Sequence, residues 1–302
     1  MEKSHVARQA ASRRGGSPAM NVRVGGLELG GTKTVVAIGT ADGAVMEEFR
    51  YATTNPEETL TIAADWWRQR GPLVKIGIAA FGPIRLQGHA CDFGTLLRTP
   101  KTAWQGFSLA NFFRERFPES LLCIDTDVNA ALLGELQCGA ARGMRNVIYV
   151  TVGTGIGAGI FCEGNLVYGT LHPEFGHLRV PRHRDDSFVG ACPFHRDCLE
   201  GLASGPAMEQ RWGLAGNLLP LHHAAWEMEA WYLAQGIYSA CTLLTPEIIL
   251  LGGGVSQQEG LHDRVAALLD ELGNGYFETY ASRIRRPALD QQAGIVGALL
   301  LS

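Results

Sequence analysis

Long apolar runs are missing from this sequence, and none reaches the roughly 20 residues that a membrane-spanning helix requires. The first 19 residues contain Arg, His, Ser and Gly where a secretory signal needs an apolar core, so we expect no signal peptide. An excess of positive charge is also missing, because the net charge is −4. This balance gives no electrostatic reason to bind nucleic acid or an acidic membrane surface. We therefore expect a soluble globular protein that binds neither nucleic acid nor a membrane.

A disulfide framework is absent as well. Seven cysteines is an odd number, and five of them lie scattered in apolar contexts: Cys91, Cys123, Cys138, Cys162 and Cys241. This usage is typical of a reducing compartment, and we expect the protein in the cytoplasm. What the sequence does have is glycine, with 38 residues clustered in short runs. Such clusters favour backbone that approaches a ligand closely rather than disorder.

The chain is long enough for two ordinary domains, with 302 residues of which 46% are hydrophobic. A strand, a turn rich in Gly and Thr, and a returning strand occur over residues 22–39 and again over residues 147–163. The two similar hairpins indicate a duplicated α/β architecture with a cleft between its halves. We expect a disordered extension or tag (1–19), an N-terminal α/β domain (20–126), a C-terminal α/β domain (127–288), and a final helix (289–302) that packs back on the N-terminal domain.

Four candidate metal ligands gather in one short part of the sequence. Cys192, His195 and Cys198 are separated by two residues each, a spacing that lets a tight loop wrap one ion. With His177 they would form the thiolate and imidazole tetrahedron that zinc prefers. Four protein ligands leave no position for water, so a zinc ion in the loop of residues 177–198 would be structural rather than catalytic.

The fourth ligand is the least determined part of this site. His172 and His183 are also nearby in the sequence, and either is an alternative to His177. The alternative to a metal site is a surface loop that happens to carry two free cysteines and several histidines. Glu174 and Glu200 lie beside candidate ligands, so a bound metal would also fix the positions of these two carboxylates.

Three glycine-rich turns lie at the ends of predicted strands. The turn Gly30–Lys33 nearly has the spacing of a P-loop, and Gly153–Gly159 resembles a dinucleotide fingerprint, but both continue into strands where those motifs open a helix. The third turn, Gly252–Gly254, ends a strand. One such turn is an ordinary hairpin feature, whereas three together favour a nucleotide cleft in which backbone N–H groups bind phosphate. The residues expected to do so are Gly30, Gly31, Thr32, Lys33, Thr151, Gly153, Thr154, Gly155, Gly253 and Gly254.

Two acidic residues mark the junction between a predicted strand and a predicted helix, at Asp125 and Asp127. Asp127 has two interpretations, as the N-cap of the helix or as a general base that takes a proton from a hydroxyl during phosphoryl transfer. Such a transfer also needs Mg²⁺ to neutralise the phosphates. Asp125 is the second candidate for the base. Glu28, ahead of the first glycine turn, is either a residue that positions Mg²⁺-bound water or an ordinary polar strand position.

Taken together, these segments resemble the ROK family of sugar kinases (repressor, open reading frame, kinase), which belongs to the actin-like ATPase superfamily. The resemblance covers about residues 22–302, and Glu28 stands where most members have Asp. Residues 192–198, with His195 where a Cys is commoner, are similar to the bacterial fructokinase branch, as are residues 202–206. The matching segments are 27–33 and 151–157 for the phosphate loops, 127–131 for the catalytic segment, and 173–177 with 198–200 for the signature that binds sugar hydroxyls and zinc.

The resemblance implies two actin-like (ribonuclease H-like) α/β domains around a central cleft, with a structural zinc loop. It implies an ATP-dependent fructokinase that uses Mg²⁺, contains structural Zn²⁺, forms a homodimer, and phosphorylates the 6-hydroxyl of D-fructose. Asp127 would be the catalytic base. The sugar would contact Gly82, Asn129, Glu174, His177 and Glu200. The alternatives are a kinase for glucose, mannose or an N-acetylhexosamine, a sugar sensor without turnover, and a zinc-dependent interaction module.

Overall fold

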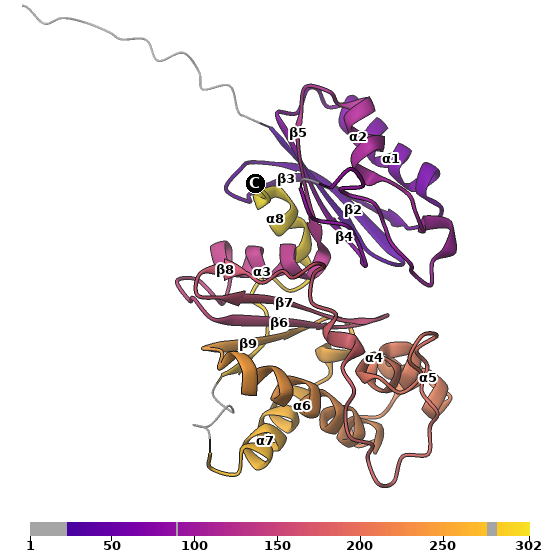
Figure 1. The fold of residues 1–302 in the computed structure, drawn as a ribbon, viewed down its shortest axis with the longest axis vertical. Coiled ribbons are helices and arrows are strands. Elements are labelled where there is room, and N and C mark those ends of the chain that lie inside the picture. The colour runs from indigo at the N-terminus through magenta and orange to yellow at the C-terminus, as the bar shows by residue number, and fades with distance from the viewer. Residues whose placement is uncertain (1–22, 89, 277–282) are drawn as a thin grey trace, which may run out of the picture.

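The computed structural model describes residues 23–88, 90–276 and 283–302, and it shows two lobes, one above the other in Figure 1. The segment 1–19, expected to be an extension or tag, lies outside the described residues. Each lobe is built on a five-stranded mixed sheet, and the chain passes from the first sheet to the second at residue 127. Within the described residues, no helix is both long enough and apolar enough to cross a bilayer.

The sheet of the N-terminal lobe has the strand order β3-β2-β1-β4-β5. Its strands are β1 (Val24–Leu29), β2 (Lys33–Gly39), β3 (Val45–Ala52), β4 (Lys75–Ala80) and β5 (Leu121–Thr126). The first three form an antiparallel meander, and β4 and β5 run parallel to β1. Alternate side chains of β1 point to opposite faces, so Leu27 and Leu29 pack with α1 (Pro56–Arg68) and α2 (Leu109–Arg116). Glu28 therefore points to the other face, towards the second lobe.

The sheet of the C-terminal lobe repeats this arrangement with the order β10-β9-β6-β7-β8. Its strands are β6 (Val147–Val152), β7 (Ile156–Cys162), β8 (Asn165–Leu166), β9 (Ile248–Gly252) and β10 (Ile284–Arg285). The pattern of parallel and antiparallel pairs is the same as in the first sheet, which confirms the predicted duplication. The outer face is covered by α6 (Ala225–Leu244) and α7 (Leu261–Gly273), while α4 (Leu199–Ala203) and α5 (Gly205–Trp212) lie at one end.

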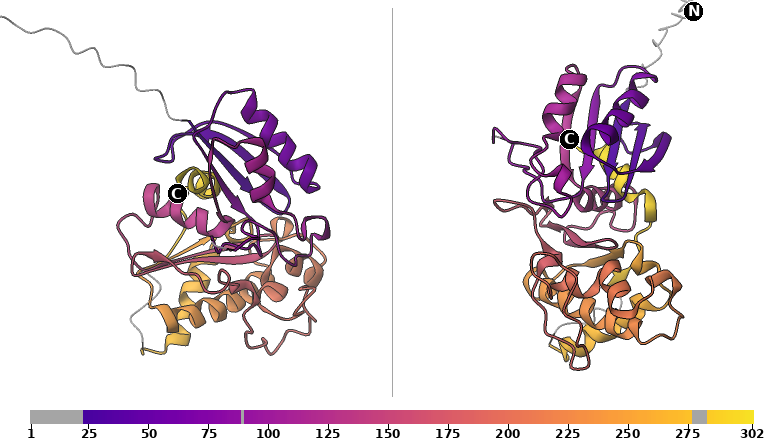
Figure 2. Two further views of the ribbon diagram at one scale, coloured as in Figure 1. Left: turned by 45° about the horizontal axis from the view of Figure 1, so that its top comes forward. Right: turned by 90° about the vertical axis from the view of Figure 1, so that its right-hand side faces the viewer.

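Two helices lie between the sheets, α3 (Asp127–Cys138) and α8 (Ala293–Leu300), as Figure 1 and the left-hand view in Figure 2 show. α8 packs on β1 and β4, α3 packs on β6 and β7, and the two helices pack against each other. Their contact is close because Gly297 has no side chain: a Cβ there would lie 1.7 Å from the carbonyl oxygen of Ala130. This helix pair fixes the start of α3, and with it Asp127, relative to both sheets.

In the hairpin expected over residues 147–163, β6 ends at Val152 and β7 starts at Ile156, inside the glycine-rich turn. It does so because Ile156 and Gly157 already pair with β6 across the hairpin. The C-terminal ends of β1, β4, β6 and β9 meet between the lobes, which is where ligands bind in α/β sheets.

Candidate active site

Two adjoining cavities lie between the lobes, with volumes of about 990 Å³ and about 290 Å³. Asp127, Val128 and Thr151 line both of them. Most of the other predicted site residues divide between the two cavities. The larger cavity is lined by Gly31, Gly82, Gly153, Thr154, Gly155, Glu174, His177, Cys192, His195 and Glu200, and the smaller one by Glu28, Lys33, Gly253 and Gly254. Asp127 is therefore the one carboxylate common to both linings within the described part of the chain.

At the start of α3, the Asp127 carboxylate accepts a hydrogen bond from the Val128 amide at 2.9 Å and lines both cavities. The interpretation of Asp127 as the N-cap is wrong, because the cap is Thr126, whose hydroxyl accepts a hydrogen bond from the Asn129 amide at 3.2 Å. Asp127 is instead the first residue of the helix. A hydroxyl at the N-cap satisfies the helix end and leaves the next carboxylate available to the cavities.

The two acids at this junction have different surroundings. Burial, with a smaller contribution from the Glu174 carboxylate, raises the pKa of Asp127 to about 6. Asp125 is 5% exposed and accepts hydrogen bonds from the Thr126 amide, the Asn129 side chain (2.8 Å) and the Tyr168 hydroxyl (2.5 Å). Asp125 lines neither cavity. A carboxylate occupied by three donors is poorly placed to take a proton from substrate, so the geometry favours Asp127 as the base.

The smaller cavity is acidic. Glu28, Asp127 and Asp290 contribute carboxylates, and Lys33 contributes the opposing charge. Burial raises the pKa of Glu28 to about 7, and its Oε2 atom is buried without a hydrogen-bond partner. Mg²⁺ is held in proteins by one or two carboxylates together with phosphate oxygens and water. The orphaned oxygen of Glu28 and the neighbouring acids fit such an ion.

Glu28 has room for its carboxylate because residue 294 is glycine. A Cβ on Gly294 of α8 would lie 2.6 Å from Cδ of Glu28. Asp290 is held in turn by Gln257, whose side-chain amide donates to Oδ1 at 2.6 Å. The acidic cavity is thus assembled from β1, α3 and the segment that leads into α8.

Glu174 and Glu200 face the larger cavity from different segments. Burial and the charge of Glu200 raise the pKa of Glu174 to about 7. Glu200 accepts a hydrogen bond from the Ile156 amide at 2.9 Å, and a Cβ on Gly155 would lie 2.7 Å from its Oε2. The second glycine turn and a candidate sugar ligand are therefore in direct contact.

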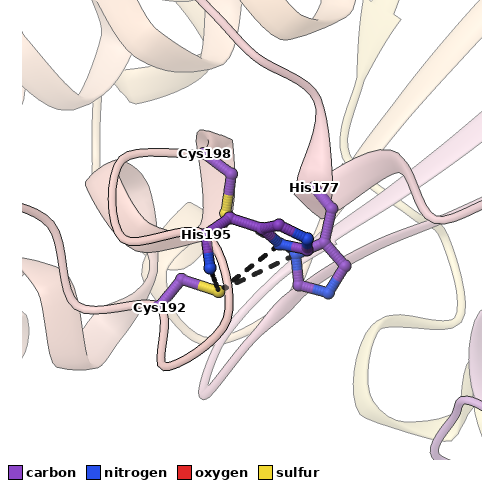
Figure 3. A group of neighbouring side chains, drawn as sticks. All are labelled: His177, Cys192, His195 and Cys198. Atoms are coloured by element: carbon purple, nitrogen blue, oxygen red, sulfur yellow. Dashed lines mark hydrogen bonds between the residues drawn. The ribbon is translucent and has the colours of Figure 1, made fainter.

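The four candidate metal ligands point towards one another (Figure 3), and their ligand atoms all lie within 4.8 Å of each other. Nδ1 of His177 lies 3.5 Å from Sγ of Cys198 and 3.9 Å from Sγ of Cys192, which lies 3.8 Å from Nδ1 of His195. A tetrahedral zinc ion with bonds of about 2.1–2.3 Å needs ligand atoms about 3.3–3.8 Å apart. Without a cation, burial raises the pKa of the Cys198 thiol to about 12, so a metal would displace its proton.

Of the three candidate histidines, the geometry selects His177. His172 accepts a hydrogen bond from the Ile84 amide at 3.2 Å, and His183 accepts one from the Asp185 amide, so neither joins the cluster. Nε2 of His177 lies 4.0 Å from the Glu174 carboxylate, while Nδ1 faces the thiols. One ring nitrogen is thus available to a metal and the other to the sugar cavity.

Four predicted residues line neither cavity: Gly30, Thr32, Asn129 and Cys198. Asn129 was expected to bind sugar, but it is 1% exposed and donates to Asp125. Cys198 belongs to the metal cluster behind the cavity wall. Within the second turn, a side chain on Gly153 would meet nothing within 4 Å, so Gly153 faces open space where Gly155 faces Glu200.

Several cavity residues escaped sequence reasoning. Lys101 and Arg98 line the larger cavity from the loop after β4, and the Arg98 guanidinium lies 5.3 Å from the ring centre of Phe194 in the metal loop. Asp290 lines the smaller cavity, and Tyr168 holds Asp125. No local spacing relates these residues to the motifs, because each reaches the site through tertiary packing.

A model of the ROK family matches residues 24–302 of this chain. The fructokinase of Zymomonas mobilis is 39% identical over 288 residues, which cover 92% of this chain and 95% of that protein. The fructokinase of Pediococcus pentosaceus is 37% identical over 281 residues, which cover 92% of this chain and 97% of that protein. The glucokinase of Streptomyces coelicolor is 26% identical over 318 residues, which cover 90% of this chain and 95% of that protein.

Solved structures show the same fold. A ROK hexokinase from Thermus thermophilus superposes with a TM-score of 0.74 at 26% identity, covering 92% of this chain and 97% of that one. A glucokinase of the same family from Streptomyces griseus, in complex with glucose and AMPPNP, gives a TM-score of 0.72 at 23% identity, covering 92% and 98%. These likenesses confirm the expected two-domain α/β fold.

Proposed function

The chain belongs to the ROK family, and we propose that it is a fructokinase that transfers the terminal phosphoryl group of ATP to the 6-hydroxyl of D-fructose. The position of Asp127 carries this proposal, because its side chain borders both the acidic cavity and the cavity of Glu174 and Glu200. The choice of fructose is supported by the fructokinase relatives, which are more similar to this chain than the glucokinase relative.

In the proposed mechanism, Glu174, His177 and Glu200 hold ring hydroxyls, so that the 6-hydroxyl lies against Asp127. The Asp127 carboxylate orients this hydroxyl and accepts its proton as the oxygen attacks phosphorus, with ADP as the leaving group. The phosphates of ATP lie along the turns at Gly31 and Gly153. Gly253 and Gly254 let the nucleotide approach the end of β9.

Two metal ions complete the proposed site. Glu28 and Asp290 would hold Mg²⁺, which neutralises phosphate charge when bound. Cys192, His195, Cys198 and His177 would hold a structural Zn²⁺. The metal loop would then order the sugar ligands without contacting phosphate.

We infer further that the protein works in the cytoplasm as a homodimer. The cysteines of the described residues are all free, which suits a reducing compartment. Sedimentation of the purified protein measures the oligomeric state directly, and a monomer at micromolar concentration would contradict the dimer.

The test of the proposed function is the identity of the product. The purified protein is incubated with D-fructose, ATP and Mg²⁺, and the products are followed by phosphorus NMR. We expect fructose 6-phosphate and ADP in equal amounts, and their formation should be about 10²–10⁴-fold slower with Asp127→Asn. A phosphate on another hydroxyl would contradict the proposed orientation, and ADP release only with another hexose would support the wider hexose-kinase alternative.

A further inference from the structure

Lys101 lies on the wall of the larger cavity, beside the first glycine turn. It lines this cavity together with Gly31 and Asp127. A Cβ built on Gly31 would lie 3.3 Å from Cε of Lys101, so the end of the lysine side chain lies beside the turn. The ammonium nitrogen is bonded to this Cε atom, so it lies within one bond length of an atom that is close to Gly31.

The position of Lys101 is fixed by hydrogen bonds that also brace the glycine turn. The Trp104 amide donates to the Lys101 carbonyl at 2.9 Å, and the buried Trp104 ring donates through Nε1 to the Thr54 carbonyl at 2.9 Å. The neighbouring Thr53 hydroxyl donates to the Gly30 carbonyl at 2.8 Å. Residues 53 and 54 thus connect the Lys101 loop to the turn, and the cation needs little rearrangement to act there.

The charge of Lys101 is not neutralised by the protein. In the described part of the chain its ammonium group takes part in no ion pair within 4.0 Å. Arg98, from the same loop, is engaged with the Phe194 ring, and Lys33 lines the smaller cavity. An uncompensated cation beside a phosphate-binding turn favours an anionic ligand at that point.

We propose that Lys101 is a catalytic residue whose ammonium group binds the terminal phosphoryl group as it passes from ATP to the sugar. This inference rests on the proposed function. In the transfer, a bond forms between phosphorus and the sugar 6-oxygen, and the bond from phosphorus to the β–γ bridging oxygen breaks. The hydroxyl proton passes to Asp127, and the electron pair of the broken bond leaves with ADP. Negative charge spreads over the three equatorial oxygens, and Lys101 stabilises it.

The test compares Lys101→Met, which keeps the aliphatic stem against Gly31, with Lys101→Arg, which keeps the charge. We expect Lys101→Met to lower kcat by about 10²–10³-fold with little change in the KM for fructose. By calorimetry with Mg²⁺ present, its affinity for AMPPNP should fall about 10- to 100-fold while its affinity for ADP stays the same. Lys101→Arg should recover part of both losses.

Arg85→Met is the matched control, because Arg85 pairs with Asp92 at 3.2 Å outside both cavities and its loss removes the same charge from the same loop. A Lys101→Met rate within about threefold of the parent would overturn the inference, and so would an equal loss of affinity for AMPPNP and ADP. If the parent phosphorylates no hexose, the proposed function fails. The comparison of AMPPNP with ADP still decides whether Lys101 binds the terminal phosphate.

Discussion

At the scale of single residues, the surroundings of Asp127 work against its negative charge. Burial and the Glu174 carboxylate raise its pKa to about 6, above the ordinary value of 3.8. Above pH 6 the carboxylate is charged and can accept a proton, but that charge destabilises the folded state relative to the unfolded chain. The destabilisation disappears as the pH falls below about 4, where both states are protonated. The charged form of Asp127 is therefore required for catalysis but lowers the stability of the folded protein.

Replacing Asp127 by Asn should lower activity and raise stability, so the variant separates the two effects of the carboxylate. The amide is isosteric and cannot accept a proton, so kcat should fall by about 10²–10⁴-fold. At pH 7.5 the ligand-free variant should melt a few degrees higher than the parent, because the buried charge is gone. Steady-state kinetics and calorimetric melting measure the two effects. A variant that keeps most of the parent rate would place the base elsewhere, and a lower melting temperature would contradict the electrostatic explanation.

The pH dependence of kcat/KM for fructose should report the same group. A base with a pKa of about 6 is protonated at lower pH, so kcat/KM should fall about tenfold for each unit below that value. The profile is measured at fixed ionic strength with ATP and Mg²⁺ saturating. A rate that stays flat down to pH 4.5 would show that Asp127 does not titrate as its surroundings require.

The two glycines of the second turn should respond differently to a side chain. Gly153→Val places atoms in open cavity space, so it should raise the KM for ATP about tenfold or more and change the KM for fructose little. Gly155→Val places its side chain against Glu200, so it should weaken the binding of both ATP and fructose. Steady-state kinetics give the KM for ATP and the KM for fructose of each variant and test this difference. If Gly153→Val affected fructose more than ATP, the assignment of this turn to phosphate would be wrong.

At the scale of elements, the metal loop and the sugar ligands form one unit. Glu174 lies three residues before His177, and Glu200 lies two residues after Cys198. The Leu199 amide donates to the Leu178 carbonyl at 2.9 Å, which joins the two segments directly behind the cluster. A metal bound by these ligands would therefore set the separation of the two carboxylates.

Removing a metal ligand should consequently affect stability and sugar binding together. Purified protein should contain about one zinc per chain. Cys198→Ser should lower the zinc content and the melting temperature, and it should raise the KM for fructose about 10- to 100-fold, more than the KM for ATP. Cys91→Ser, at an exposed cysteine outside the cluster, is the control. Fully active protein without zinc by elemental analysis would refute a structural zinc ion.

How far the sequence predicts these elements depends on whether the signal is local. The strands around each glycine turn follow from their own residues, and the order of the three cysteine and histidine ligands at 192–198 is visible in their spacing. The first residue of α3 cannot be predicted in this way. Thr126 and Asp127 are both good N-cap residues, and a shift of one residue exchanges their roles. Asn129 is likewise polar in sequence yet buried in the structure, where it donates to Asp125.

At the scale of the whole molecule, the site exists only where the lobes meet. The larger cavity takes Gly31 and Lys101 from one lobe and Glu174 and Glu200 from the other. The sequence predicts the cleft, because two similar hairpins indicate two halves. It does not predict which side chains from distant segments meet there, since Lys101 lies 70 residues from Gly31 and reaches it only through the folded lobe.

The most direct test of the central claim is the specificity of the purified protein among hexoses. Release of ADP is measured with fructose, glucose, mannose and N-acetylglucosamine at saturating ATP and Mg²⁺, giving kcat/KM for each sugar. We predict that kcat/KM for fructose exceeds that for every other hexose by about tenfold or more, and that Asp127→Asn slows the release about 10²–10⁴-fold. A higher kcat/KM for another hexose, or no ADP release with any sugar, would contradict a fructokinase.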